Sequence, residues 1–127
     1  MMLPYPISTN KMWRNFRGRM VLSAEGNAYK VTVAWLAKTH KVKVVDGDVA
    51  ITVILHPRRN KDGTASKSRL DIDNVLKCAL DSLNGIAYTD DKQVVMLHAT
   101  IGEPVPDGGL SVLVEKHIPL QNKCEIV

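Results

Sequence analysis

Residues 71–95 read DIDNVLKCALDSLNGIAYTDDKQVV, and the pattern of this stretch predicts a helix, a turn and then a strand. Its apolar residues recur at the spacing of one face of an amphipathic helix: Val75, Leu76, Ala79, Leu80 and Leu83. Asn84-Gly85 follows, and such a pair is typical of a helix end. A strand is then expected over residues 93–101.

Further strands are predicted on both sides of this stretch. Residues 48–56 alternate and are rich in β-branched side chains, which favours a strand that buries one face. Asp46-Gly47 predicts a turn before that strand, and the polar, basic residues 57–68 are expected to form a loop after it. A last strand is predicted over residues 110–116.

A second helix is predicted over residues 23–39. Ser23 is suited to the N-cap, and the apolar residues that define the expected inner face are Ala24, Ala28, Val31 and Trp35. Gly26 stands where a capping-box glutamate would be, so the cap is incomplete. Residues 3–19 are expected to be mostly loop, with a short strand at the start.

These elements predict one α+β domain over residues 1–127, a mixed β-sheet with about two helices packed on it and a loose tail at residues 118–127. Cys78 and Cys124 have no Cys or His neighbour at zinc spacing. No apolar run approaches the ~20 residues that span a bilayer, and the first residues lack the features of a secretory signal. We therefore expect a cytoplasmic protein without a membrane partner.

Charge is distributed unevenly along the chain. Residues 71–91 hold five aspartates and one lysine, a net charge of −4, so the rest of the chain carries +8 to give the overall +4. The cations expected to contact DNA phosphates are Lys11, Arg14, Arg17, Arg19, Lys67 and Arg69. An acidic site within a basic surface suits an enzyme that cleaves phosphodiesters, although a mixed, solvated surface is the alternative interpretation.

Asp71, Asp73 and Asp91 are the predicted metal ligands. Residues two apart in an extended chain point to the same side, so Asp71 and Asp73 can face one ion. Asp73 also stands where the helix cap is expected, at the positive end of the helix dipole. Asp91, at the start of the next strand, would supply the third carboxylate. Oxygen ligands without cysteine or histidine select Mg²⁺, with Mn²⁺ able to substitute.

Lys77 is the predicted catalytic helper, because it lies four residues after Asp73 on the same helix face. Its charge can stabilise a pentacovalent phosphate or protonate the leaving oxygen. Asn74 and Asp90 are candidates for a supporting role, with helix capping as an equal alternative for Asn74.

Each of these residues also has a purely structural interpretation. Asp73 could be only an N-cap that contributes ~1 kcal/mol, and Asp73 with Lys77 only an exposed pair that contributes about 0.3–0.5 kcal/mol. Asp90-Asp91 could be turn residues before a strand. The concentration of acids in one stretch of a basic chain favours the metal site.

Three segments carry a resemblance to a known family: Arg69 to Lys77 (RLDIDNVLK), Ala79 to Leu83 (ALDSL) and Asp90 to Val95 (DDKQVV). They resemble the central signature of the RusA family of Holliday junction resolvases. Leu3 to Pro6, with Ser8 and Asn10, and then Arg17 to Tyr29, are similar to the family's opening segment and first helix. The resemblance covers roughly residues 3–115. Only Met1 and Met2 precede the proline segment, so the first strand is expected to be very short.

The resemblance implies a homodimer that binds four-way DNA junctions and nicks two strands symmetrically, in DNA recombination and repair. It implies Asp71, Asp73 and Asp91 as metal-binding catalytic residues and Lys77 as a further catalytic residue, with Mg²⁺ and no organic cofactor. One or two metal ions would activate the attacking water. It also implies a bacterial source, which includes phage or prophage. Trp13 and Phe16 could stack on unpaired bases, with packing as the alternative.

Two other functions could use the same residues. The chain could be a nuclease that acts on flaps, replication forks or RNA, because the carboxylate chemistry is shared. It could instead be a non-catalytic protein that binds junctions, although the presence of all three aspartates and Lys77 argues against a damaged site.

Overall fold

The centre of the fold is a four-stranded mixed sheet in the order β1-β6-β4-β5. The computed structural model describes residues 1–68 and 71–118. Its sheet consists of β1 (Met2–Leu3), β4 (Val49–His56), β5 (Val94–Ile101) and β6 (Gly109–Lys116). Strand β5 is parallel to β4, whereas β6 is antiparallel to both β4 and β1. The mixed sheet and the very short first strand are as predicted.

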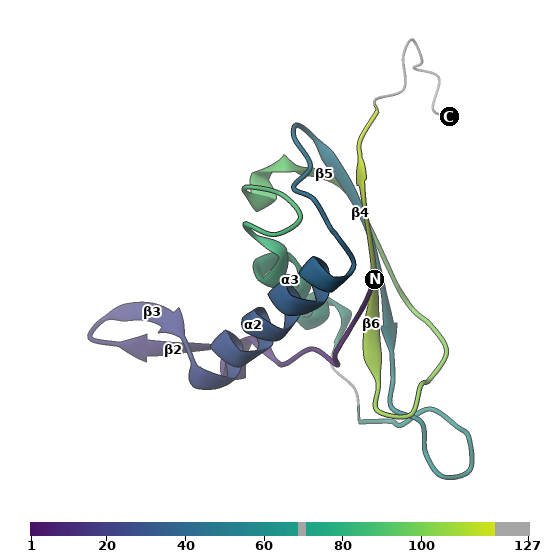
Figure 1. Cartoon of the computed structure of the whole chain (residues 1–127). Helices are drawn as coiled ribbons and strands as arrows, with labels where there is room; N and C mark the ends of the chain where they lie inside the picture. Colours follow the sequence, from purple (N-terminus) through teal and green to yellow (C-terminus); the bar gives the residue numbers. More distant parts are fainter. Residues whose placement is uncertain (69–70, 119–127) are drawn as a thin grey trace, which may run out of the picture.

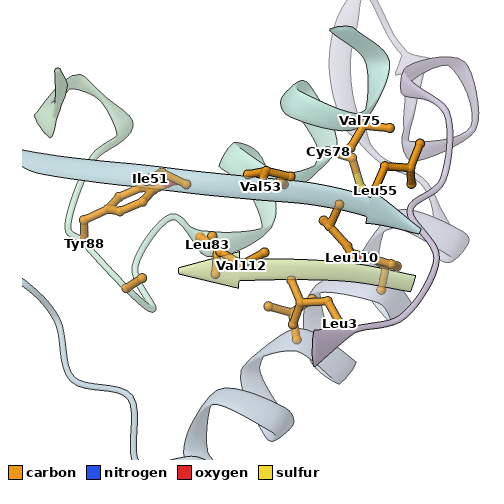
Figure 2. Close-up of a cluster of buried hydrophobic side chains, with 14 of the residues drawn as sticks. Leu3, Ile51, Val53, Leu55, Val75, Cys78, Leu83, Tyr88, Leu110 and Val112 are labelled. Atoms are coloured by element: carbon orange, nitrogen blue, oxygen red, sulfur yellow. The ribbon is translucent and has the colours of Figure 1, made fainter. Parts of the chain in front are cut away.

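Two helices, α2 (Ala24–Thr39) and α3 (Ile72–Leu83), lie on one side of this sheet (Figure 1). Alternate residues of β4 point toward them and are fully buried, which confirms the predicted inner face: Val49, Ile51, Val53 and Leu55. Figure 2 shows Val75 and Cys78 of α3 in the same apolar cluster as Leu55. Burial of each such aliphatic side chain stabilises the fold by roughly 1.5–3 kcal/mol. This packing fixes α3, and with it the residues of the candidate site.

The other side of the sheet has no helix among the described residues (Figure 1). It carries exposed apolar side chains. The register places Met96 of β5 and Leu113 of β6 on this side, opposite Ala50 and Thr52 of the central strand. Met96 is 55% exposed and Leu113 is 54% exposed.

A short helix and a hairpin occupy the region that was predicted to be mostly loop. Helix α1 spans Thr9–Met12, and the antiparallel strands β2 (Trp13–Phe16) and β3 (Arg19–Leu22) project from the body of the protein (Figure 1). Arg17 and Gly18 both have positive φ, 52° and 77°, as a two-residue type I′ turn requires. The loop prediction was wrong because these strands are mostly exposed and lack apolar alternation.

Helix α2 begins with Ser23 as its N-cap, as predicted, but it buries a different face. Ser23 Oγ accepts a hydrogen bond from the backbone N–H of Gly26 at 3.0 Å. The buried residues are Gly26, Tyr29, Val33 and Ala37, whereas Val31 is 60% exposed and Trp35 is 68% exposed. A Cβ at Gly26 would lie 2.3 Å from the backbone oxygen of Met12. Because only glycine allows α1 to approach this closely, the helix face that contains Gly26 is the one that is buried.

The remaining elements agree with the sequence predictions within one or two residues. Gly47 has a φ of 81° in the predicted turn, and Gly85 has a φ of 78° just after α3. No helix among the described residues has the length and apolar character that crossing a membrane requires. The tail predicted for residues 118–127 lies outside the described residues, apart from Ile118.

Candidate active site

Asp71 and Asp73 lie at the N-terminal end of α3, and both are exposed. Asp71 is the N-cap residue, with extended backbone, and its carbonyl accepts the N–H of Val75 at 3.1 Å. Its side chain makes no capping bond. The helix thus starts before Asp73, so the predictions that Asp73 is the cap and that both aspartates lie in extended chain were wrong. Both carboxylates still lie at the positive end of the helix dipole.

Lys77 and Asp81 continue the same face of α3, one and two turns beyond Asp73. Asp81 Oδ2 accepts a hydrogen bond from Nε1 of Trp13 at 3.3 Å, which ties the β2–β3 hairpin to the helix. Lys77, Asp81, Trp13 and Met20 line a cavity of about 300 Å³. Among the described residues no ion pair within 4.0 Å joins Asp73 to Lys77, so the alternative in which the two form only a surface ion pair finds no support there.

The sequence interpretation did not assign a role to Asp81 or to Lys30. Nζ of Lys30 donates to the backbone oxygens of Asp81 and Asn84, both at 3.1 Å, so α2 supplies a cation to the negative end of α3. The spacing of Asp73, Lys77 and Asp81 at four-residue intervals could have identified one charged face. The contact made by Lys30 has no signal in the sequence, because 51 residues separate it from Asp81.

Asp90 and Asp91 lie in a short turn that precedes β5. Asp90 is the N-cap of the 3₁₀ helix η1 (Asp91–Gln93), and its Oδ1 accepts the N–H of Lys92 at 2.9 Å. Gln93 completes a capping box by accepting the N–H of Asp90 at 3.0 Å. Nε2 of Gln93 also donates to the backbone oxygens of Val45 and Gly47. This network holds Asp91 at one end of the sheet.

The two neighbouring aspartates differ in acidity. The hydrogen bond from the backbone of Lys92 lowers the pKa of Asp90. Partial burial raises the pKa of Asp91, and the nearby carboxylates of Asp90 and Asp81 raise it further. Like charges that raise a pKa in this way also create a negative potential, which attracts cations.

The three predicted metal ligands do not form one cluster within a single chain. Among the described residues, which include all three, no group of three or more His, Cys, Asp or Glu side chains is placed to hold a metal ion. Asp91 has Asp81 and Asp90 as its charged neighbours, and Asp81 lies two turns, roughly 12 Å, along α3 from Asp73. Within one chain Asp71 and Asp73 thus lie at the start of α3, and Asp91 has Asp81, near the end of the helix, as its neighbour.

The predicted DNA-contact residues are exposed wherever the structure describes them. Arg14, Arg17 and Arg19 lie on the hairpin, and Lys11 and Lys67 are exposed elsewhere. The guanidinium carbons of Arg14 and Arg17 lie 5.1 Å and 5.2 Å from the ring centroid of Phe16, which is itself 46% exposed. Trp13, in contrast, is half-buried against α3.

Asn74 and Asp90, the two residues predicted to support the site, lie in different elements. Asp90 caps η1, and Asn74 is half-buried in the first turn of α3. Arg69 lies outside the described residues.

Comparison with known proteins identifies a single family. Residues 4–115 match the family model described as Endodeoxyribonuclease RusA. The chain is 34% identical over 107 residues to the crossover junction endodeoxyribonuclease RusA of Escherichia coli strain K12, an alignment that covers 84% of each chain. It is 33% identical to the protein of the same name from Enterobacteria phage 82, again over 84% of each chain. The chain belongs to the RusA family.

Proposed function

We propose that this protein is an endonuclease that binds four-way DNA junctions and resolves them by paired nicks. The observation that carries the proposal is the charged face of α3, which has acids at both ends and Lys77 between them. The basic β2–β3 hairpin is tied to this face through Trp13. The curated relatives are named crossover junction endodeoxyribonucleases, which supports the same substrate class.

In this proposal each group of residues has a distinct task. Arg14, Arg17 and Arg19 on the hairpin contact phosphates, since exposed guanidinium groups bind them and a projecting hairpin can reach into a branched substrate. Lys77 supplies positive charge to the phosphate that is attacked. Asp71, Asp73 and Asp91 are the essential carboxylates.

We further propose that two copies of the chain together complete each site. Asp71 and Asp73 of one copy would lie beside Asp91 of the other, because one chain keeps these groups at opposite ends of α3. Trp35 of α2, on the same side of the sheet as α3, is 68% exposed and offers apolar surface for such an association. A dimer also suits a reaction that cuts two strands symmetrically.

Mg²⁺ is the proposed ion for the shared site, with Mn²⁺ as a substitute. The three side chains offer only hard carboxylate oxygens, and these cations prefer such ligands. The negative potential around Asp81, Asp90 and Asp91 supports cation binding at that end. Mg²⁺ titrated into the protein without DNA is expected to bind, and Asp91→Asn is expected to weaken that binding.

Cleavage of a synthetic four-way junction tests the proposal, with a linear duplex of the same sequence as the control. The substrates are incubated with Mg²⁺, Mn²⁺ or EDTA and with either the native chain or Asp73→Asn. We expect paired, symmetric nicks in the junction alone, lost with EDTA and with Asp73→Asn. Equal cutting of the duplex, or a preference for flaps or forks, would show another nuclease activity. Binding without nicking in either metal would show a non-catalytic junction-binding protein.

A further inference from the structure

We propose that a cavity beside the α3 site binds one unpaired nucleotide of the DNA substrate, an inference that rests on the proposed function and extends it. The cavity has a volume of about 390 Å³, which lies within the range of pockets that bind small organic ligands. Its polar and aromatic lining comes from the N-terminal segment, the start of α2 and the loop after β4: Tyr5, Ser8, Lys11, Glu25, Arg58 and Ser68.

Backbone hydrogen bonds hold the walls of the cavity in place. The Tyr29 hydroxyl donates to the backbone oxygen of Pro4 at 2.8 Å and so fixes the N-terminal segment to α2. The carbonyl of Ser8 accepts the N–H of Lys11 at 3.0 Å, and the carbonyl of Arg58 accepts the N–H of Ser66 at 2.8 Å. A pocket with fixed walls loses little conformational entropy when a ligand enters.

One wall is a stack of an aromatic ring and a guanidinium group. Cζ of Arg58 lies 4.3 Å from the ring centroid of Tyr5. Gly108 packs closely against both groups, because a Cβ at this position would lie 2.6 Å from Cδ1 of Tyr5 and 3.1 Å from Cγ of Arg58. Unpaired bases stack on aromatic rings and on guanidinium planes. This wall therefore suits a flat, unpaired base.

The charges in the cavity match the other parts of a nucleotide. Lys11 can bind the phosphate. Glu25 adds a carboxylate to the lining. A carboxylate only accepts hydrogen bonds, and adenine, cytosine and guanine carry an exocyclic amino group that thymine lacks. The cavity is therefore expected to favour the three bases whose amino group offers two hydrogens over thymine, whose only donor is N3–H.

The cavity lies within a few nucleotides' reach of Asp71, a proposed catalytic residue. Ser68 precedes Asp71 by three residues, and three residues of chain span at most roughly 11 Å. Successive nucleotides of a stacked strand rise about 3.4 Å each. A strand whose phosphate reaches Asp71 can therefore place a base in the cavity within about three nucleotides. Occupation of the cavity would hold the strand open beside the cut.

The test is binding of four-way junctions that carry one extra unpaired nucleotide at the crossover, measured in EDTA so that no cleavage occurs. The extra nucleotide carries adenine, cytosine, guanine, thymine or no base. Arg58→Ala removes the stacking group, and Glu25→Gln replaces the acceptor with a side chain that also donates. Arg59→Ala is the matched control, since Arg59 is the next residue and its Nη2 donates to the backbone of Pro104 instead. Circular dichroism verifies the fold of each variant.

For the native chain we expect about tenfold tighter binding when the unpaired nucleotide has a base with an amino group than when it has none. Arg58→Ala should abolish this gain, whereas Arg59→Ala should keep it. Glu25→Gln should keep the gain and remove the discrimination against thymine. Equal affinity for base and abasic junctions, or equal behaviour of Arg58→Ala and Arg59→Ala, would overturn the nucleotide cavity. Cleavage of the fully paired junction tests the proposed function separately, so the failure of one does not imply the failure of the other.

Discussion

At the scale of single residues, Asp90 and Asp91 have identical side chains but different roles, because their backbone surroundings differ. Asp90 accepts the N–H of Lys92 and caps η1, so its carboxylate is used within the turn. Burial and the neighbouring carboxylates of Asp90 and Asp81 destabilise the charged form of Asp91. A bound cation would stabilise the charged form of this carboxylate, as expected of a metal ligand.

Asp91→Asn is therefore expected to lower the rate of junction cleavage by at least about a hundredfold, while the melting temperature stays equal or rises because like-charge repulsion is removed. Asp90→Asn is the control, because asparagine caps a helix as well as aspartate does. The measurement is the single-turnover nicking rate beside a thermal melt. If Asp90→Asn proved as inactive as Asp91→Asn, the distinction between the two residues would be wrong.

Gly26 provides a second test at this scale. In an exposed helix, replacement of glycine by alanine stabilises by about 1 kcal/mol, but here the added Cβ would lie 2.3 Å from the backbone oxygen of Met12. Gly26→Ala is expected to destabilise the fold by about 1–3 kcal/mol in urea unfolding. Asn27→Ala, at an exposed position in the same turn, should change stability by less than about 0.5 kcal/mol. A stabilised Gly26→Ala would contradict the contact between α1 and α2.

At the scale of elements, the sequence was most informative where one face of an element is completely buried. The strict alternation of β4 predicted its bounds and inner face, because every second residue meets a helix. The face of α2 was predicted wrongly, since apolar residues occur on several sides and contact between Gly26 and α1 decides the orientation. The hairpin was missed because its strands bury little and depend on a turn of positive φ at Arg17 and Gly18.

The geometry of the candidate site was not predictable from the sequence. The spacing of the acids indicated Asp71, Asp73 and Asp91, yet their separation depends on the length of α3 and on the turn that returns to the sheet. The hydroxyl of Tyr88 donates to the carbonyl of Leu80 at 2.8 Å and so fixes this turn against the end of α3. A contact of this kind has no local signal in the sequence.

The β2–β3 hairpin leads to a prediction about salt. If Arg14 and Arg17 each neutralise one phosphate, replacement of either by alanine should reduce the slope of log affinity against log salt by about 0.9. The assay is junction binding in EDTA at several salt concentrations. Lys116→Ala, at the end of β6, removes one charge away from the hairpin and should leave the slope unchanged. Equal slopes for all three variants would show that the hairpin makes no phosphate contact.

At the scale of the whole molecule, the fold separates the groups that the chemistry needs together. One chain has Asp71 and Asp73 at the start of α3, and Asp91 lies near Asp81 toward its end. The proposed second copy would bring Asp91 beside Asp71 and Asp73. Light scattering is expected to give twice the chain mass of 14.1 kDa at micromolar concentration, and a monomeric mass would contradict the dimer.

Complementation between two inactive variants tests the shared site most directly. Asp73→Asn and Asp91→Asn are coexpressed with different affinity tags, the mixed dimer is isolated by both tags, and nicking of a four-way junction in Mg²⁺ is measured. In the mixed dimer one site carries both substitutions and the other carries neither. We expect each homodimer to be inactive and the mixed dimer to nick one of the two strands. A mixed dimer as inactive as the homodimers would show that each chain uses only its own carboxylates.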